Sequence, residues 1–256
     1  MTDRVSIVTG GAGVFGKAIG ERLARRGDTV VLVDRDGTQA EAVAKELTAL
    51  ELPGTVLGAE VDVASDAANR QLVADVRERH GRLDCLINNA GVSQKARFGS
   101  LTYEEWRMVL DVNLWGPTSL SQAAAAVWRE EPGGAIVNMA SRTWSAGGPL
   151  SYASSKAGVV GLTRALAAEL GRYDVRVNAL APSFVPAPRI ASMFTPEGYQ
   201  EHIARAADLP LLNRTATADD VAGTVAYLTS PDSAFVSGEV IHVTGGSQLP
   251  RPAFKK

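Results

Sequence analysis

Short apolar runs rich in β-branched residues alternate with longer helical patterns along nearly all of the 256 residues. The apolar runs predict strands over Val5–Thr9, Thr29–Val33, Thr55–Val61, Leu83–Asn88, Ala135–Met139, Val175–Leu180 and Val240–Val243. The helical patterns predict helices over Phe15–Arg26, Thr38–Leu50, Asp66–His80, Tyr103–Val112, Thr118–Arg129, Tyr152–Leu170 and Ala218–Thr229. Most of the predicted strands are apolar on both faces, which is typical of a parallel sheet covered by helices on each side. We therefore predict a doubly wound α/β fold around a seven-stranded parallel sheet.

The chain shows no internal repeat, low-complexity tract or linker, so we predict a single domain over residues 1–256. One stretch breaks the regular alternation. The connection from Pro182 to Leu212 is long and contains five prolines. A connection of this length in a compact domain is usually functional, often as a lid. We therefore expect residues 182–212 to form a loop or lid that contacts the substrate.

Composition argues against several classes of protein. The formal net charge is −2, so nothing indicates binding to nucleic acid or to an anionic membrane. No apolar run approaches the roughly 20 residues that span a bilayer, and an apolar strand begins almost at once, without a leader. We therefore expect a cytoplasmic protein. The single cysteine, Cys85, lies in an apolar run and is interpreted as a core residue, and the three histidines show no metal-ligand spacing.

The first predicted strand runs directly into a glycine-rich turn, Thr9-Gly10-Gly11-Ala12-Gly13-Val14-Phe15-Gly16, and a helical pattern follows. Glycines in such a turn let the backbone approach a pyrophosphate, which sits at the helix N-terminus. Asp34 follows the second predicted strand, where a carboxylate can accept both hydroxyls of an adenosine ribose and would repel a 2′-phosphate. This favours NAD over NADP. Arg35 follows directly and could pair with a phosphate, so it keeps NADP open.

Polar and small residues also follow the third and fourth predicted strands. Asp62 and Val63 close the third strand, where the carboxylate could meet the adenine amino group, and Asn88-Asn89-Ala90-Gly91 closes the fourth. Asparagine side chains after a strand can brace neighbouring backbone, while Ala90 and Gly91 leave room for a ribose. Ligands of open parallel sheets bind beyond the carboxyl ends of the strands. We therefore expect these motifs to meet in one dinucleotide site.

Tyr152 and Lys156 stand four residues apart in a predicted helix and so share one of its faces. Lowering a tyrosine pKa from about 10 to about 7 requires roughly 4 kcal/mol of differential stabilisation. One ammonium about 4.5 Å away, at an effective dielectric constant of about 20, supplies close to that. The pair is a candidate general base for an alcohol at neutral pH. Two ordinary surface side chains could show the same spacing, and the other motifs favour catalysis.

Together these motifs resemble the short-chain dehydrogenase/reductase superfamily in its compact single-domain form, from Val5 to Gly246. The resemblance implies a Rossmann-type fold and a catalytic tetrad of Asn113, Ser141, Tyr152 and Lys156. It implies that Tyr152 exchanges a proton with the substrate oxygen and that Ser141 hydrogen-bonds that oxygen. Lys156 would lower the pKa of Tyr152 and bind the nicotinamide ribose, and Asn113 would hold a water that connects Lys156 to solvent. The expected cofactor contacts are Gly10, Gly13, Phe15, Gly16, Asp34, Arg35, Asp62, Val63, Asn89, Ala90, Gly91, Tyr152, Lys156, Pro182 and Val185.

The chain departs from the family pattern at several positions near the expected cofactor. Val14 replaces the second glycine of the turn, and Gly13 stands one place earlier. Ser183 replaces the glycine that usually follows the proline after the sixth strand, and Ala187 replaces a threonine often found nearby. The last two changes bear on a contact to the nicotinamide carboxamide. Backbone groups of Val185 could make that contact instead.

Substrate contacts are expected from residues 92–98, 142–150 and 182–212, whose aromatic content predicts an apolar or aromatic pocket. The larger side chains in these loops are Phe98, Trp144, Phe184, Met193, Phe194 and Tyr199. Arg142 and Arg189 could each bind a substrate carboxylate, although arginines in loops are more often solvated. We predict an NAD(H)-dependent oxidoreductase that interconverts a moderately bulky secondary alcohol and its ketone, with Tyr152 as general acid/base.

Two other functions stay open at this point. One is an NADP-dependent ketoreductase of the 3-oxoacyl type, which Asp34 disfavours and Arg35 keeps open. The other is a dinucleotide-binding sensor without turnover, which would have no need of the tetrad. The predicted helix over Tyr152–Leu170 carries small residues that permit close helix packing. The family resemblance implies that it packs between subunits of a homotetramer or homodimer.

Overall fold

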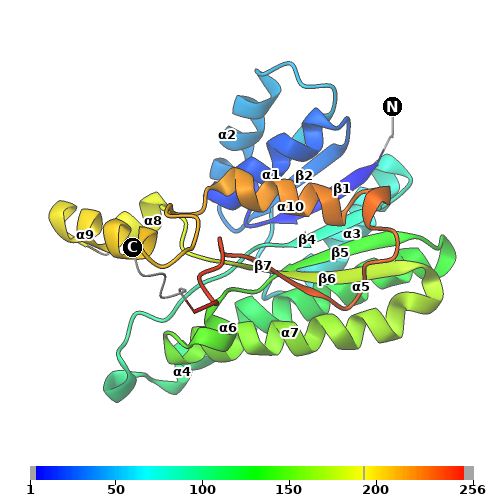
Figure 1. Cartoon of the computed structure of the whole chain (residues 1–256). Coiled ribbons are helices and arrows are strands. Elements are labelled where there is room, and N and C mark those ends of the chain that lie inside the picture. The colour runs from blue at the N-terminus through cyan, green and yellow to red at the C-terminus, as the bar shows by residue number, and fades with distance from the viewer. Residues whose placement is uncertain (1–3, 193, 251–256) are drawn as a thin grey trace.

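The computed structural model describes residues 4–192 and 194–250, except for the side chain of Arg189. Its centre is a seven-stranded parallel sheet in the order β3-β2-β1-β4-β5-β6-β7 (Figure 1). The strands are β1 (Val5–Thr9), β2 (Thr29–Asp34), β3 (Thr55–Glu60), β4 (Cys85–Asn88), β5 (Gly134–Met139), β6 (Val175–Pro182) and β7 (Val240–Val243). The chain order reverses beside β1, which is the switch point of a doubly wound sheet. The predicted Rossmann-type fold is confirmed.

Two apolar clusters cover the two faces of the sheet. Successive residues of β1 show the alternation, since Ile7 packs into one cluster and Val8 into the other. One face is covered by α1 (Val14–Arg25), α2 (Gly37–Thr48) and α10 (Ala218–Leu228). The other is covered by α3 (Asp66–His80), α5 (Gly116–Glu130) and α7 (Leu150–Leu170). Cys85 is a buried core residue, as predicted, and burial raises the pKa of its thiol to about 11.

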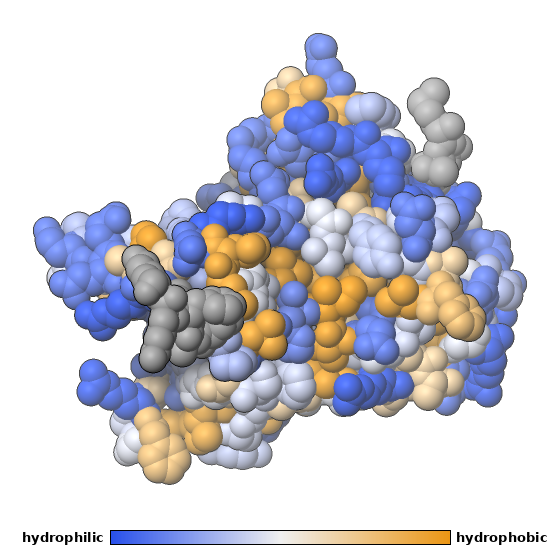
Figure 2. Space-filling view, viewed as in Figure 1, coloured by the Kyte–Doolittle hydropathy of each residue, from blue (hydrophilic) through white to orange (hydrophobic). Residues whose placement is uncertain are grey.

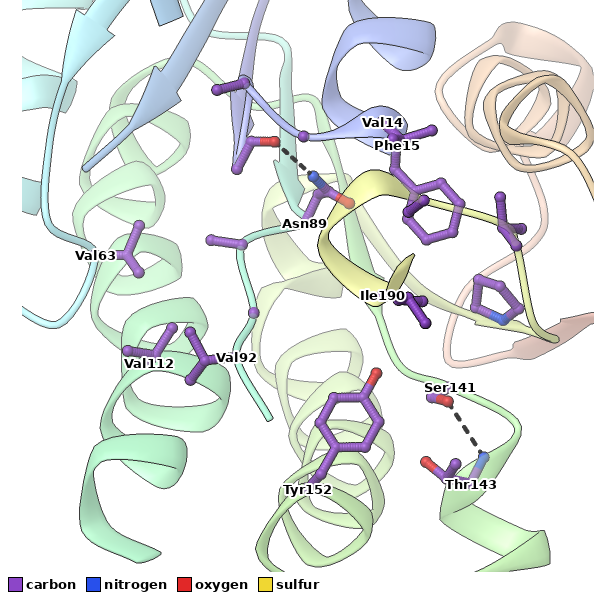
Figure 3. Close-up of a pocket in the computed structure, with 18 of the residues that line it drawn as sticks. Val14, Phe15, Val63, Asn89, Val92, Val112, Ser141, Thr143, Tyr152 and Ile190 are labelled. Carbon is purple, nitrogen blue, oxygen red and sulfur yellow. Dashed lines mark hydrogen bonds between the residues drawn. The ribbon is translucent and has the colours of Figure 1, made fainter. Parts of the chain in front are cut away.

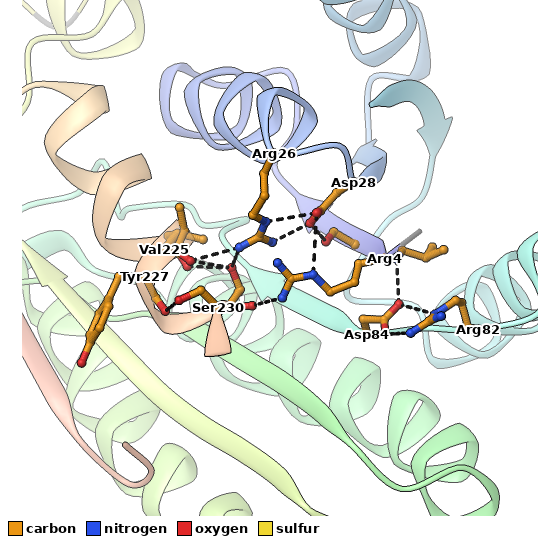
Figure 4. Close-up of polar contacts among 12 residues, drawn as sticks. Arg4, Arg26, Asp28, Arg82, Asp84, Val225, Tyr227 and Ser230 are labelled. Atoms are coloured by element: carbon orange, nitrogen blue, oxygen red, sulfur yellow. Dashed lines mark hydrogen bonds and ion pairs between the residues drawn. The ribbon is translucent and has the colours of Figure 1, made fainter. Parts of the chain in front are cut away.

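The amino end of the sheet is closed by a buried carboxylate (Figure 4). Asp28, just before β2, has a fully buried side chain and accepts from Arg26 at 2.5 Å and from Ser6 Oγ at 3.1 Å. Arg4 lies 3.8 Å away on its other side. The guanidinium of Arg26 also donates to Thr229 Oγ1 at 2.9 Å, which ties this end to α10. Ligands of open parallel sheets bind at the opposite, carboxyl ends of the strands.

The segment after β6 differs from the predicted loop. It contains two helices, α8 (Pro188–Ala191) and α9 (Pro196–Ala207), which project beyond the carboxyl ends of the strands (Figure 1). Each begins with a proline, which is tolerated in the first turn because no intrahelical bond is needed there. The prolines therefore mark helix starts as well as turns. Both ends of the segment return to one place, since Ser183 N donates to Val243 O at 3.0 Å and Leu211 N to Gly245 O at 2.8 Å.

The predicted helix over Tyr103–Val112 is also interrupted. Only α4 (Tyr103–Leu110) is α-helical, and residues Asp111–Trp115 form a π-helical turn that leads into α5. Such turns often occur at functional sites. The short helix α6 (Thr143–Ala146) was not predicted either.

Partly exposed apolar side chains gather around the sheet edge at β7. All four residues of β7 are half-buried, and Figure 2 shows an apolar band there, between α10 and α7. An uncovered edge of this kind is a common place for contact with another chain. The predicted homo-oligomer remains a prediction. No helix in residues 4–192 and 194–250 is long and apolar enough to cross a bilayer.

Candidate active site

One cavity of about 1370 Å³ opens at the carboxyl ends of the strands. Its lining includes most of the residues predicted from sequence for the cofactor and the chemistry: Gly10, Gly13, Phe15, Asp34, Arg35, Asp62, Val63, Asn89, Ala90, Gly91, Ser141, Tyr152, Pro182 and Val185. Gly16, Asn113 and Lys156 are not part of the lining, but each contacts a residue that is: Gly10, Val92 and Tyr152, respectively. The sheet topology therefore brings together segments that are far apart in sequence, as strand ends of a doubly wound fold require.

The glycine turn between β1 and α1 is a close backbone contact. Gly10 has a φ of +64°, which favours glycine. A Cβ on Gly16 would lie 2.2 Å from Gly10 O, so a side chain at that position cannot be accommodated in this turn. Gly13 caps α1, and Val14 begins the helix with its side chain 37% exposed. The replacement of the second family glycine by Val14 thus leaves the close approach of Gly10 and Gly16 intact.

The turn is held in place by the end of β4. Asn89 Nδ2 donates to Thr9 O at 2.8 Å and to Gly10 O at 3.1 Å. Figure 3 shows Asn89 beside the turn, with one hydrogen bond from its side chain drawn as a dashed line. Thr9 Oγ1 accepts from the backbone N–H groups of Asn89 and Ala90, both at 3.0 Å. These bonds satisfy the backbone where two strands end, and they leave Ala90 and Gly91 facing the cavity. Asn89 therefore braces neighbouring backbone, as predicted for an asparagine after this strand.

Two carboxylates stand at neighbouring strand ends. Asp34 Oδ2 accepts from Ala12 N at 3.2 Å, and its Oδ1 accepts from Asp36 N at 3.3 Å, so the side chain links β2 to the glycine turn. Asp62, after β3, accepts from Ala64 N at 3.0 Å. Arg35 is exposed beside Asp34 and also lines the cavity. The site therefore offers a carboxylate and a guanidinium at the place expected for the adenosine ribose.

Buried asparagines connect the strands beneath the cavity to α7. Asn88 Nδ2 donates to Asn138 Oδ1 at 2.8 Å, and Asn138 Nδ2 donates to Thr163 Oγ1 at 3.0 Å. Asn138 and Thr163 were missed by the sequence analysis. A polar residue in the middle of an apolar strand was the available signal, because a buried amide must find partners. The chain of bonds fixes α7 against β5, and with it the position of Tyr152.

Tyr152 and Ser141 face the same part of the cavity. Figure 3 shows the phenol of Tyr152 rising from α7, with Ser141 beside it and Ile190 of α8 across the cavity. Ser141 follows β5, and its Oγ accepts from Thr143 N at 3.3 Å. An accepting hydroxyl still has its own proton to donate. Two O–H groups that can donate a proton to a bound molecule therefore line this part of the cavity.

Lys156 lies one helical turn beyond Tyr152 and is only 4% exposed. Its Nζ donates to Met139 O at 2.7 Å and lies 5.5 Å from the centre of the Tyr152 ring. A Cβ on Gly91 would lie 3.5 Å from the same Nζ, so Lys156 also reaches the end of β4. The predicted sharing of one helix face is confirmed, and the ammonium is buried between β4, β5 and the phenol.

Asn113 lies in the π-helical turn and is completely buried. Its Oδ1 accepts from Val92 N at 2.8 Å, and its Nδ2 donates to Val92 O at 2.8 Å and to Ser155 Oγ at 3.0 Å. The side chain therefore braces the segment after β4 against α7. The predicted role of Asn113 in holding a water remains a prediction.

The substrate end of the cavity is walled by fewer aromatic side chains than predicted. Of the aromatic residues proposed from sequence, Phe184 lines the cavity, whereas Phe98 is 81% exposed and Trp144 packs against His242. Phe194 and Tyr199 border a separate shallow depression on α9. They act indirectly, because Phe194 stacks on His202, which does line the cavity. Met193 and the side chain of Arg189 lie outside the described residues.

No group of three or more histidine, cysteine, aspartate or glutamate side chains among the described residues could hold a metal ion.

Comparison with known proteins agrees with this geometry. A family model described as Enoyl-(Acyl carrier protein) reductase matches residues 11–248. The BbsD subunit of (2S)-[(R)-hydroxy(phenyl)methyl]succinyl-CoA dehydrogenase from Thauera aromatica is 38% identical over 253 residues, which cover 96% of this chain and 97% of that protein. The chain belongs to the short-chain dehydrogenase/reductase superfamily.

Two further members of the superfamily cover nearly the whole chain. The 3-oxoacyl-[acyl-carrier-protein] reductase FabG of Thermotoga maritima is 34% identical over 245 residues, covering 95% of this chain and 97% of that one. A structure of a short-chain type dehydrogenase/reductase from Mycobacterium ulcerans superposes with a TM-score of 0.89 at 29% identity, covering 98% of this chain and 92% of that one. This short-chain dehydrogenase/reductase is thus a member of a family of oxidoreductases.

Proposed function

We propose that this protein is an NAD(H)-dependent oxidoreductase that interconverts a secondary alcohol and a ketone. One observation carries the proposal: the phenol of Tyr152 and the hydroxyl of Ser141 line the same cavity as the glycine turn and Asp34. Proton transfer and hydride transfer must occur at adjacent atoms of one substrate, so acid/base and dinucleotide groups need to share a site. The names of the BbsD and FabG relatives, a hydroxyalkyl dehydrogenase and an oxoacyl reductase, support the same exchange.

The residues of the cavity fit a nicotinamide dinucleotide. The contact of Gly10 with Gly16 leaves the start of α1 bare, so that its N–H groups and dipole can receive a pyrophosphate. Asp34 would accept the ribose hydroxyls, and Ala90 and Gly91 would leave room for the rest of the molecule. A dinucleotide bound in this way supplies the nicotinamide carbon that accepts or donates the hydride.

Tyr152 is proposed to move the proton. Oxidation of a secondary alcohol removes one hydride from carbon and one proton from oxygen, and the phenolate of Tyr152 takes that proton. In the reverse direction the phenol returns it to the ketone oxygen as negative charge develops there. The Ser141 hydroxyl donates to the same oxygen and stabilises its charge. Lys156, held at 2.7 Å from Met139 O, favours the phenolate because it places a cation near the ring.

A second candidate is an NADP-dependent ketoreductase of the 3-oxoacyl type. Arg35 lines the cavity next to Asp34 and could pair with a 2′-phosphate. The likeness to FabG supports this alternative. Asp34 opposes it, because its carboxylate would face the added phosphate.

The direct test is absorbance of the reduced nicotinamide with NAD and NADP and a panel of secondary alcohols and ketones. We expect turnover with NAD, and Tyr152→Phe should lower kcat by about 100- to 10,000-fold, since it removes the general acid/base. Binding of NADH and the melting temperature should remain close to wild type. Normal turnover by Tyr152→Phe would contradict the mechanism. Binding without turnover of any panel member would instead support a sensor.

A further inference from the structure

Four arginines line the cavity: Arg35, Arg107, Arg142 and Arg205. Two of them already have carboxylate partners four residues away along the chain. Arg107 lies 3.8 Å from Asp111, and Arg205 donates to Glu201 at 2.9 Å. The charges of these two guanidinium groups are therefore compensated without a ligand.

Arg35 belongs to the opposite end of the cavity. It follows β2, whereas Ser141 and Arg142 follow β5, and two strands lie between β2 and β5. Three strand spacings correspond to roughly 14 Å. Arg35 is therefore placed for the adenosine end of a dinucleotide rather than for the reacting carbon.

Arg142 differs from the other three. It is half-buried at the substrate end and directly follows Ser141, so the two Cα atoms are about 3.8 Å apart. Its backbone is fixed, since Arg142 N donates to Pro182 O at 3.0 Å and Arg142 O accepts from Ala146 N at 3.1 Å. Its guanidinium makes no ion pair with any of the residues that the structure describes. Figure 3 shows its neighbours Ser141 and Thr143 at the cavity wall.

The surroundings of Arg142 indicate which chemical group would pair with the charge of its guanidinium. Phe184, Ile190 and Leu209 give this end of the cavity apolar walls. Glu104 also lines the cavity, but it is exposed on α4 and forms no ion pair with Arg142. A guanidinium that is partly withdrawn from water next to apolar walls gains most from a bidentate carboxylate.

Resting on the function proposed above, we propose that Arg142 binds a carboxylate of the substrate. The substrate is then a hydroxy acid or oxo acid with an apolar body. Its carboxylate stands only a few bonds from the carbinol, because Arg142 is adjacent to the serine that holds the carbinol oxygen. The oxidation releases a hydride from the carbinol carbon and a proton to Tyr152, and it leaves the carboxylate unchanged.

The test uses matched pairs of probes: 2-hydroxy and 3-hydroxy acids that carry a phenyl or hexyl group, each with its methyl ester. The quantity measured is the ratio of kcat/KM for the acid to kcat/KM for the ester, so any loss common to both cancels. We expect the wild type to prefer one acid, and Arg142→Met to lower that ratio by at least about tenfold. Arg142→Lys should retain part of the preference, because an ammonium keeps the charge but not the bidentate geometry.

Arg205→Met is the matched control, since it removes a guanidinium that lines the same cavity but is already paired. It should change the ratio by less than about threefold. A ratio that Arg142→Met leaves unchanged would overturn the proposal, as would a wild type that oxidises the esters and none of the acids. A tenfold weaker binding of NADH by Arg142→Met, with an unchanged ratio, would assign Arg142 to the dinucleotide instead. If no acid, ester or neutral alcohol reacts, the proposed function itself fails.

Discussion

The two ends of the cavity are built in different ways. At the dinucleotide end, Gly10 and Asn89 are fixed by hydrogen bonds between neighbouring strand ends, and the backbone itself forms the wall. At the substrate end, part of the wall comes from Ile190 of α8 and His202 of α9, two helices that lie outside the sheet (Figure 1). There His202 is held between rings, stacked on Phe194 at 4.9 Å and edge-on to Phe184 at 4.7 Å. We therefore expect the first end to be rigid and the second to change shape more readily.

Among changes that compare the two ends, the largest effect should come from Gly16→Ala, which tests the rigidity of the dinucleotide end. The added Cβ would lie 2.2 Å from Gly10 O and 2.6 Å from Gly11 Cα, so backbone must move. We expect a loss of about 3 kcal/mol in the free energy of unfolding. NADH affinity should fall by at least about 100-fold, which corresponds to about 2.7 kcal/mol. Denaturant unfolding and fluorescence titration measure the two effects.

Gly171→Ala is the control for this substitution. Gly171 has a φ of −56°, and a Cβ there would meet no atom within 4 Å. Its free energy of unfolding should stay within about 0.5 kcal/mol of wild type. Wild-type NADH binding by Gly16→Ala would mean that the turn is not the rigid element described above.

Asp34→Ala asks which dinucleotide the rigid end selects. We expect the preference for NADH over NADPH to fall by about 10- to 100-fold, since the carboxylate that repels a 2′-phosphate is gone while Arg35 remains. Asp36→Ala is the control, because Asp36 caps α2 through Gln39 N at 3.0 Å and does not line the cavity. Dissociation constants for both dinucleotides measure the preference. If Asp34→Ala leaves the ratio of the NADH and NADPH dissociation constants unchanged, Asp34 does not select NAD.

Tyr199→Phe tests how loosely the substrate end is held. The phenol of Tyr199 accepts from Ala187 N at 3.0 Å and donates to Ala187 O at 3.3 Å, which ties α9 to the start of α8. Losing these bonds should lower the free energy of local opening of this segment by about 1 kcal/mol. Hydrogen exchange in residues 188–207 should then become about fivefold faster. Tyr227→Phe, on the exposed face of α10, is the control. Equal protection in both variants would show that other contacts hold the segment.

An effect of similar size is expected where the chain leaves the substrate segment for α10. Arg214 donates to both oxygens of Asp220, at 2.6 and 2.9 Å, and Thr217 N donates to Asp220 at 2.8 Å. These bonds, and above all those from Arg214, hold the pKa of Asp220 well below its usual range. A lowered folded-state pKa stabilises the protein above the unfolded pKa of about 3.9, and this contribution is lost as the pH falls below it.

Asp220→Asn should therefore lower the free energy of unfolding by about 1 kcal/mol at pH 7, a modest value because the pair is partly exposed. The difference from wild type should shrink when the pH falls below about 4. Denaturant unfolding at several pH values measures it. Asp219→Asn, one residue earlier and exposed, serves as the control. A difference that grows towards low pH would have the wrong sign for this explanation.

The dinucleotide end could be predicted from sequence because its signals are local. Gly10 and Asn89 each stand directly after an apolar strand and Asp34 ends one, and the parallel topology determines where strand ends meet. The strand bounds were correct to within two residues for the same reason. Buried strands have continuous apolar runs, and polar residues mark where they stop.

The substrate end could not be predicted because its contacts are tertiary. The prolines of residues 182–212 indicated a loop, yet Pro188 and Pro196 begin helices, and proline is compatible with both. Nothing local distinguishes Phe184, which lines the cavity, from Phe98, which faces solvent. The π-helical turn around Asn113 also has no sequence period of its own, because it adds one residue to a turn of an otherwise regular helix.

The segment that carries α8 and α9 leaves and rejoins the sheet at one point, since Ser183 is bonded to Val243 and Leu211 to Gly245. A segment whose two ends lie side by side can be replaced as a unit without moving the strands that carry it. Recombining the coding sequence between these two anchors with that of a relative would transplant a new specificity onto unchanged redox machinery. For the laboratory, this makes the anchors the natural crossover points for chimaeric enzymes.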